Sequence, residues 1–413
     1  MRTPRAVVRI AVTVALAVSL GGCWLQPGFD AGRGNWNPLE FQLNSHTVGA
    51  GLTSRWNTTV FPVVTPVNAP LASGGRIYTT TGFGASVSAL DARTGAIVWT
   101  TDLLDQSGNI FAQSLSAPVL DHGELLVKKV IDATHGALYR LDPDTGAVLS
   151  TTPTDPVGRV AVAGGVPAVL TRTAAAVQVR WKFDAIVPIS LEAGAPNSFA
   201  IVGDRLLWAH GTSATGYSSA CPPNPAGGCG PDWSTDLGDQ VTDVSAVGHG
   251  QAVYTYGRSG VAVLDTATGA VRWTASVGQT FGSAGVVAVA GGKIVVAVAD
   301  EFINPPRLLA FPAGGCGAAT CSPVWRVDFD DLGSIQPPFV AAGDLVWATG
   351  RLPGGDTAIH AFALRGCGAP TCGPLTSIPY GMNGGNAIVD GGQLIVGDII
   401  GRVTAYGLPA PAK

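Results

Sequence analysis

Short apolar runs alternate with glycine-containing turns along most of the chain. At residues 88–99, SALDARTGAIVW places one apolar run before Asp91, a Thr94-Gly95 pair in the turn, and a second apolar run that ends at Trp99. Two such runs around a glycine-containing loop predict a β-hairpin. Asp91 can accept hydrogen bonds from backbone N–H groups two residues on, and Gly95 can take the positive φ that the turn needs. We therefore expect this peptide to be a tight turn.

The same peptide returns as YRLDPDTGAVLS at 139–150 and as AVLDTATGAVRW at 262–273. A phosphate-binding role for its glycine would require a following helix, and a β-branched run predicts a strand instead. The repeat is therefore interpreted as a device for shape. The residues that form it are Ala89, Asp91, Thr94, Gly95 and Trp99 in the first copy, Asp142, Thr145 and Gly146 in the second, and Asp265, Thr268, Gly269 and Trp273 in the third.

A shorter signal, an apolar strand after a glycine turn, precedes each hairpin and sets the register of a larger repeat. Its glycines are Gly75, Gly123, Gly165, Gly203, Gly250, Gly292, Gly343 and Gly392, spaced 38 to 51 residues apart. This spacing is typical of a four-stranded propeller blade. We predict an all-β fold, an eight-bladed β-propeller of four-stranded antiparallel blades.

The last unit lacks its final strand, and residues 52–60 carry Trp56 where such a strand should have one. We predict that this N-terminal strand joins the last blade and closes the ring, which protects edge strands. The third unit, roughly residues 157–190, lacks the Asp and the Thr-Gly pair. Seven blades with an irregular insert are therefore the alternative.

Seven cysteines bear on the compartment and on metal binding. Six of them fall in close pairs, which predict three disulfides in an oxidising compartment. The alternative is a zinc site built from two C-x4-C pairs, which would require four thiolates around one metal. The expected pairs are Cys221 with Cys229, Cys316 with Cys321, and Cys367 with Cys372.

The first residues predict export rather than fold. Three arginines precede an apolar run of eleven residues, Ile10 to Leu20, which is too short to span a bilayer. The following LGGC resembles a bacterial lipobox, which implies cleavage before Cys23 and lipid on its thiol. We expect a lipoprotein signal peptide at 1–22, a tether at 23–51, the propeller at 52–408 and a tail at 409–413.

Charge limits the classes of partner. Only 13% of the residues are charged and the formal net charge is −4, without a basic stripe in the body of the chain. Nucleic acid is therefore not an expected partner.

The pattern Ala-x-Asp-x-x-Thr-Gly-x-x-x-Trp resembles the repeat of the PQQ-like, or quinoprotein-type, eight-bladed propellers. The first copy matches in full, the third has Val263 for the Ala, and the second has Arg140 and Ser150 in place of Ala and Trp. The resemblance covers about residues 52–408 and implies that the tryptophans dock between neighbouring blades. The lipoprotein layout is also similar to that of the BamB family of outer-membrane protein assembly.

The enzymes that share this repeat imply a site that the chain lacks. They carry a vicinal Cys-Cys disulfide under the quinone, a calcium held by Glu, Asn and Asp, and an Asp as general base. This chain has no adjacent cysteines, no C-x-x-C-H haem motif and no G-x-S-x-G elbow. Acidic groups at Asp328, Asp330 and Asp331, and at 232–239, could bind calcium but are interpreted as solvated loops.

These observations predict a protein that is not an enzyme and holds no cofactor or metal. We expect a monomeric, lipid-anchored extracytoplasmic propeller at a bacterial cell membrane. It would bind an envelope protein or peptide as a scaffold or assembly factor. The alternatives are a quinone-dependent dehydrogenase and a small-ligand or sugar-binding lipoprotein, each with its site in the central funnel.

Overall fold

The computed structural model describes most of the chain. Among the described residues the regular structure is β-strand apart from one 3-10 helix, η1 (Val48–Ala50). No helix in these parts is long and apolar enough to cross a membrane. The described residues are 24–62, 64–104, 114–132, 135–154, 160–163, 165–172, 176–180, 184–188, 198–218, 220, 228–248, 250–278, 286–298, 306–330, 339–380 and 385–410.

Within these ranges the strands form eight sheets, most of four antiparallel strands. The first half of the chain supplies β1 (Trp36–Asn37), β2 (Thr53–Thr59), β3 (Leu71–Ser73), β4 (Arg76–Thr80), β5 (Ser86–Asp91), β6 (Ile97–Asp102), β7 (Ser114–Leu115), β8 (Val119–Asp121), β9 (Glu124–Val130), β10 (Gly136–Leu141), β11 (Val148–Thr154), β12 (Val160–Ala163), β13 (Val166–Arg172), β14 (Ala176–Arg180), β15 (Asp184–Pro188), β16 (Ser198–Val202) and β17 (Arg205–His210).

The second half of the chain supplies the remaining strands. It supplies β18 (Ser213–Tyr217), β19 (Trp233–Asp236), β20 (Val241–Gly248), β21 (Gln251–Tyr256), β22 (Gly260–Asp265), β23 (Val271–Ser276), β24 (Val286–Ala290), β25 (Lys293–Val298), β26 (Arg307–Pro312), β27 (Trp325–Asp328), β28 (Phe339–Ala342), β29 (Leu345–Arg351), β30 (Thr357–Ala363), β31 (Thr376–Pro379), β32 (Gly385–Asp390), β33 (Gln393–Asp398) and β34 (Arg402–Gly407).

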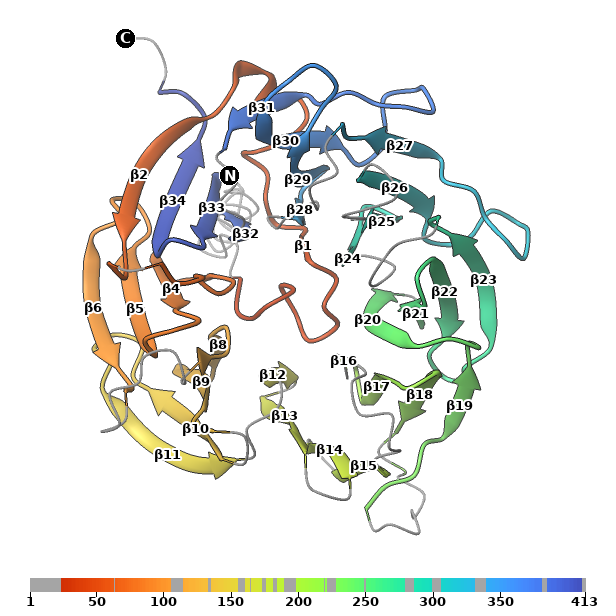
Figure 1. Ribbon diagram of the computed structural model, residues 1–413, viewed down its shortest axis with the longest axis horizontal. Helices are drawn as coiled ribbons and strands as arrows, with labels where there is room; N and C mark the ends of the chain where they lie inside the picture. Colours follow the sequence, from red (N-terminus) through yellow and green to blue (C-terminus); the bar gives the residue numbers. More distant parts are fainter. Residues whose placement is uncertain are drawn as a thin grey trace, which may run out of the picture.

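The sheets follow one another around a common centre, with one strand of each sheet toward the centre and one toward the rim (Figure 1). The predicted pairing of the two chain ends is present, because β2 lies antiparallel to β34 in the sheet β2-β34-β33-β32. The weakly patterned third unit also forms a sheet, in the order β12-β13-β14-β15. The arrangement is therefore all-β and propeller-like.

The turn between the first two strands of each sheet explains the glycine register. The predicted turn glycines all have φ between +54° and +79°, a region in which only glycine avoids strain between Cβ and the backbone. Those glycines are Gly75, Gly123, Gly165, Gly203, Gly250, Gly292, Gly343 and Gly392.

The hydrophobic core lies between neighbouring sheets. One cluster joins Val253 and Trp273 of the β20–β23 sheet to Ile294 and Phe311 of the β24–β27 sheet. Middle strands such as β22 are buried along nearly their whole length. Both faces of such a strand are packed, which accounts for the continuous apolar runs in the sequence.

Residues 24–50 differ from the expected tether. Trp24, Leu43 and Val48 are buried in the hydrophobic core, and Asn37 and Glu40 are buried as well. The prediction of a tether for residues 24–50 was therefore wrong. This segment satisfies backbone groups at the inner edges of the sheets, a role that no composition rule signals. In Figure 1 it runs through the centre of the ring of sheets.

Candidate functional site

The Asp-x-x-Thr-Gly peptide forms the rim hairpin that the sequence predicts. Asp91 Oδ1 accepts hydrogen bonds from the backbone N–H of Thr94 at 2.8 Å and from the Thr94 hydroxyl at 2.8 Å. Asp142 and Asp265 make the same contacts with Thr145 and Thr268. These bonds lower the pKa of Asp91, chiefly through the Thr94 hydroxyl. Each carboxylate is thus used within its own turn.

The glycine of each turn makes room for a tryptophan of the preceding sheet. A Cβ on Gly95 would lie 2.5 Å from the Trp56 ring, and one on Gly146 would lie 2.5 Å from the Trp99 ring. The indole N–H of Trp99 donates to Pro143 O at 2.9 Å. Trp docking between neighbouring sheets, which the family resemblance implied, is therefore present, and Ala89 pairs with Trp99 across the β5–β6 hairpin.

Two rim hairpins carry disulfides in place of the Asp-Thr pair. Cys316 and Cys321 are bonded, as are Cys367 and Cys372. These sulfurs are therefore not zinc ligands, and the zinc alternative is wrong for both pairs. Cys229 is also disulfide-bonded, while Cys221 lies outside the described residues.

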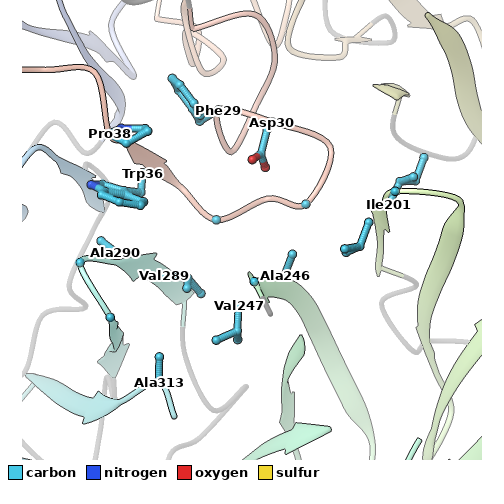
Figure 2. Close-up of a pocket in the computed structure, with 17 residues that line it drawn as sticks. Phe29, Asp30, Trp36, Pro38, Ile201, Ala246, Val247, Val289, Ala290 and Ala313 are labelled. Atoms are coloured by element: carbon cyan, nitrogen blue, oxygen red, sulfur yellow. The ribbon is translucent and has the colours of Figure 1, made fainter. Parts of the chain in front are cut away.

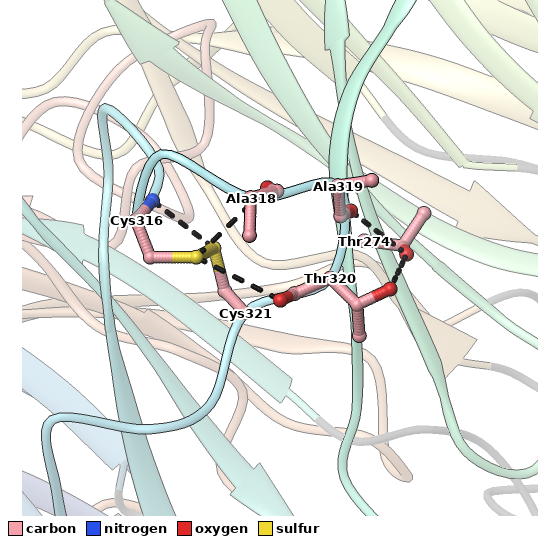
Figure 3. Close-up of a disulfide and its surroundings, with 6 residues drawn as sticks. All are labelled: Thr274, Cys316, Ala318, Ala319, Thr320 and Cys321. Carbon is pink, nitrogen blue, oxygen red and sulfur yellow. Dashed lines mark hydrogen bonds between the residues drawn. A yellow bond between two sulfur atoms is a disulfide. The ribbon is translucent and has the colours of Figure 1, made fainter.

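The disulfide loops hold the neighbouring sheet by its backbone. Thr274 of β23 donates its N–H to Ala319 O at 2.8 Å, and its carbonyl oxygen accepts from Cys321 N at 2.8 Å. Figure 3 shows the Thr274 hydroxyl bonded to Ala319 O and to the Thr320 hydroxyl of the same loop. The second loop pairs in the same way with the backbone of Arg326. Gly315 and Gly366 lie against Trp273 and Trp325, as Gly95 lies against Trp56.

The centre holds a segment of single-copy sequence, residues 24–40, which we call the strap. Its first residues bond to the innermost strands of three successive sheets. Trp24 and Ala72 of β3 exchange two backbone hydrogen bonds of 2.9 and 3.0 Å. Leu25 O accepts from Leu120 N, and the Gln26 side chain bonds both the N–H and the C=O of Val162.

The rest of the strap continues in sheet order around the centre. Its carbonyl groups accept backbone N–H groups from β16, β20, β24 and β28 in turn, and the Asn37 side chain donates to Val389 of β32. Every one of the eight sheets therefore bonds to the strap. The acceptors are Ala31 for Ile201, Gly32 for Ala246, Gly34 for Val289, Asn35 for Ala341 and Asn37 for Gly343.

Two charged groups fix the strap between sheets. The Arg33 guanidinium lies 2.5 Å from the Asp243 carboxylate and also bonds to Ser198, so it links β20 to β16. Glu40 is buried and accepts the N–H of Gly392 at 2.9 Å. Burial, and then the charge of Glu40, raise the pKa of the nearby Asp390 carboxyl to about 7.

A pocket of about 430 Å³ opens beside the strap, and it is the candidate functional site. Phe29, Asp30 and Trp36 of the strap form one side (Figure 2). The innermost strands of three sheets and the turns that follow them form the other side, including Ala246 of β20 and Val289 of β24. Burial raises the pKa of Asp30 against the lowering effect of N–H groups at Gly32, Arg33 and Gly34.

The pocket offers one carboxylate among apolar and aromatic surfaces. This set can bind a small amphipathic group or a cationic side chain. It does not fit the calcium-quinone set of the related enzymes, because the disulfides Cys316–Cys321 and Cys367–Cys372 lie in rim hairpins and neither joins adjacent residues. Nor do the described residues bring three or more His, Cys, Asp or Glu side chains together around a metal position.

Two of the acidic residues singled out in the sequence form ion pairs. Asp328 pairs with Arg326 at 3.0 Å, and Asp232 pairs with Arg205 at 3.2 Å. Asp331 and Cys23 lie outside the described residues. Sequence reasoning missed the strap and Asp30; a run of Gly, Asn and Pro ahead of the first strand was the available signal.

The sequence profile of the family described as "Outer membrane protein assembly factor BamB" matches residues 53–217 and 203–313. These spans cover more than half of the chain. The chain belongs to this family. It is a PQQ-like propeller that resembles BamB.

Solved structures share the fold of this BamB-type chain at low identity. The quinohemoprotein alcohol dehydrogenase from Comamonas testosteroni has a TM-score of 0.65 at 14% identity, over 98% of this chain and 83% of that one. A europium-containing methanol dehydrogenase has a TM-score of 0.65 at 11% identity, over 96% of this chain and 100% of that one.

BamB from Moraxella catarrhalis has a TM-score of 0.55 at 12% identity, over 88% of this chain and 99% of that one. No curated protein matches the sequence. These likenesses include both enzymes and an assembly factor, so they describe the fold and leave the function to the site.

Proposed function

We propose that the protein is a non-catalytic, lipid-anchored propeller that binds a protein or peptide partner at a bacterial cell envelope. In this proposal the eight sheets are the blades of an eight-bladed propeller that β2 closes. Lipid on Cys23 holds the protein to the membrane on the extracytoplasmic side. The protein then serves as a scaffold or assembly factor, as the family's description suggests.

The observation that carries the proposal is that the strap occupies the centre of the ring of sheets. The strap bonds to all eight sheets and takes the central position where a funnel site would lie. The pocket beside it is lined by one carboxylate, Asp30, rather than by the acid, amide and disulfide set of a quinone enzyme. A partner would then bind to the outer surfaces of the ring, as expected of a protein that recognises other proteins.

A cross-linking experiment tests partner binding. A photo-reactive amino acid is placed at Leu149 of β11 or Val271 of β23, which are 52% and 45% exposed on rim strands. The same residue at the buried Leu207 is the matched control. We expect one envelope protein to be cross-linked from an exposed position and not from Leu207. Absence of any specific adduct from a panel of exposed sites around the ring would contradict the proposal.

A second candidate function is the binding of a small amphipathic ligand in the pocket. The observation that favours it is that Asp30 lines the pocket together with the aromatic residues Phe29 and Trp36. A melting-temperature screen with cationic amphiphiles and sugars tests it. A saturable increase that Asp30→Asn abolishes would support this function, and no increase with any compound would contradict it.

A further inference from the structure

The strap and the residues after it lie over one end of the ring. Asn37 O accepts from Gly343 in the β28–β29 turn, and Glu40 accepts from Gly392 in the β32–β33 turn. Both contacts are with turns that join the first and second strands of a sheet. We call this end, with residues 24–43 over it, the strap face.

The strap begins on this face without a spacer. Trp24 has only 1% of its surface exposed and exchanges two backbone hydrogen bonds with Ala72 of β3. Residue 23 is therefore one peptide unit away from a fixed position on the ring. An acyl chain on that residue would start at the ring and not at the end of a flexible tether.

Within the strap face, residues 24–51 themselves carry few charges, whereas the turns of the sheets at this end hold exposed acids such as Asp204 and Asp344. Between residues 24 and 51 the acidic residues are Asp30 and Glu40, and the basic ones are Arg33 and His46. Arg33 is paired with Asp243, and Glu40 is buried. Leu39 and Phe41 are 46% and 74% exposed, although the residues on either side of Phe41 pack against the ring.

We propose that the strap face rests on the lipid bilayer, with Phe41 and Leu39 in its interfacial region. This inference rests on the lipidation of Cys23 in the proposed function. Lipid on residue 23 holds the chain at the membrane, and apolar side chains beside it add a second contact that sets the orientation of the ring. The partner then reaches the rim or the opposite end of the ring.

The opposite end supplies a matched control. The strand β29 starts beside the strap face at Leu345 and ends at Arg351, so the following turn lies about 20 Å away along the strand. Asp356 in that turn is exposed. A label there measures the distance of the far end from the membrane.

The experiment uses the full-length, lipidated protein in vesicles of phosphatidylethanolamine and phosphatidylglycerol. A thiol-reactive fluorophore is attached to Phe41→Cys, Leu39→Cys or Asp356→Cys, and quenching by doxyl-labelled phospholipid is measured. Protein without an added cysteine gives the background labelling. The mass of the N-terminal peptide is measured separately, so that a failure of lipidation is distinguished from a failure of the orientation.

We expect several-fold stronger quenching at positions 41 and 39 than at position 356. Equal quenching at the three positions, no quenching at any, or stronger quenching at position 356 in a lipidated protein would overturn the orientation. Loss of the lipid from the N-terminal peptide would overturn the anchor and the orientation together.

Discussion

The rim and the centre of the molecule are built on different principles. At the rim the same hairpin recurs, and in each copy a glycine receives a tryptophan from the preceding sheet, as Gly146 receives Trp99. At the centre a single strap bonds to all eight sheets, through different residues of the strap for different sheets. Because the rim hairpin is repeated, its motif can be recognised in the sequence. The strap occurs once and has no repeated motif.

The rim itself shows two ways to hold one geometry. In the β5–β6 hairpin Asp91 holds the turn through Thr94, and in the β26–β27 hairpin a disulfide closes the longer loop. Both place a glycine, Gly95 or Gly315, against a tryptophan. The required element is thus the contact between glycine and indole, and the means of closing the turn can vary.

The largest expected effect comes from filling that contact. Gly146→Val places a Cβ 2.5 Å from Trp99 at a φ of +74°. Backbone strain and overpacking together should lower the free energy of unfolding by about 3 kcal/mol. Urea denaturation followed by tryptophan fluorescence measures the change.

The matched control is Gly123→Val, at a φ of +79° with open space around its Cβ position. Here only the strain remains, and we expect a loss of about 1–2 kcal/mol. Equal losses in the two variants would show that the tryptophan contact is not what the rim glycine provides.

Removal of a disulfide is expected to have the next largest effect. The double variant Cys367→Ala, Cys372→Ala opens a short loop, and the chain-entropy model gives a loss of about 2 kcal/mol. Thermal unfolding with and without reductant measures it. Relative to the oxidised wild type, reduction of the wild type should lower the melting temperature more than the double substitution does, because reduction opens the other disulfides as well. A variant as stable as the wild type would mean that the backbone bonds to Arg326 suffice.

At the centre, Asp390→Asn should stabilise the protein. Burial and Glu40 raise the pKa of Asp390 from 3.8 to about 7, so its ionisation costs stability as the pH rises through that interval. Above pH 7 we expect the variant to be more stable by on the order of 2 kcal/mol. Below the ordinary value of 3.8 the two proteins should melt together, and a gain that persists there would contradict the assignment.

The smallest expected effect is the acid sensitivity of the rim turns. The Arg272 guanidinium is the main cause that lowers the pKa of Asp265 from 3.8 to about 2, with Thr268 adding to it. A lowered folded-state pKa contributes stability above 3.8 that is lost as the pH falls toward 2. The melting temperature of Asp265→Asn should therefore fall less than that of the wild type over this interval. Parallel curves would count against the assignment.

The predictability of the molecule follows the same division. Local sequence patterns predict three features of the fold. They are the turn glycines, the hairpins at Asp91, Asp142 and Asp265, and the pairing of residues 53–59 with the last sheet. Turn chemistry and strand alternation act over a few residues, so one sequence is enough to find them.

The strap could not be found in this way. Residues 24–40 show neither helical nor strand periodicity, and their bonds reach partners as distant as Val389. Such a segment resembles a linker in composition, which is why a tether was expected. Asp30 was missed for the same reason, since the pocket exists only once the strap lies against the sheets.

The proposed function requires that the strap, and not a quinone cofactor, occupies the centre of the propeller. A melting-temperature titration of residues 24–413 with pyrroloquinoline quinone and Ca²⁺ tests it most directly. The account predicts no change in a cooperative melt. A saturable increase that needs both components would contradict it, since ligand at a hundred times its Kd adds about 2.7 kcal/mol.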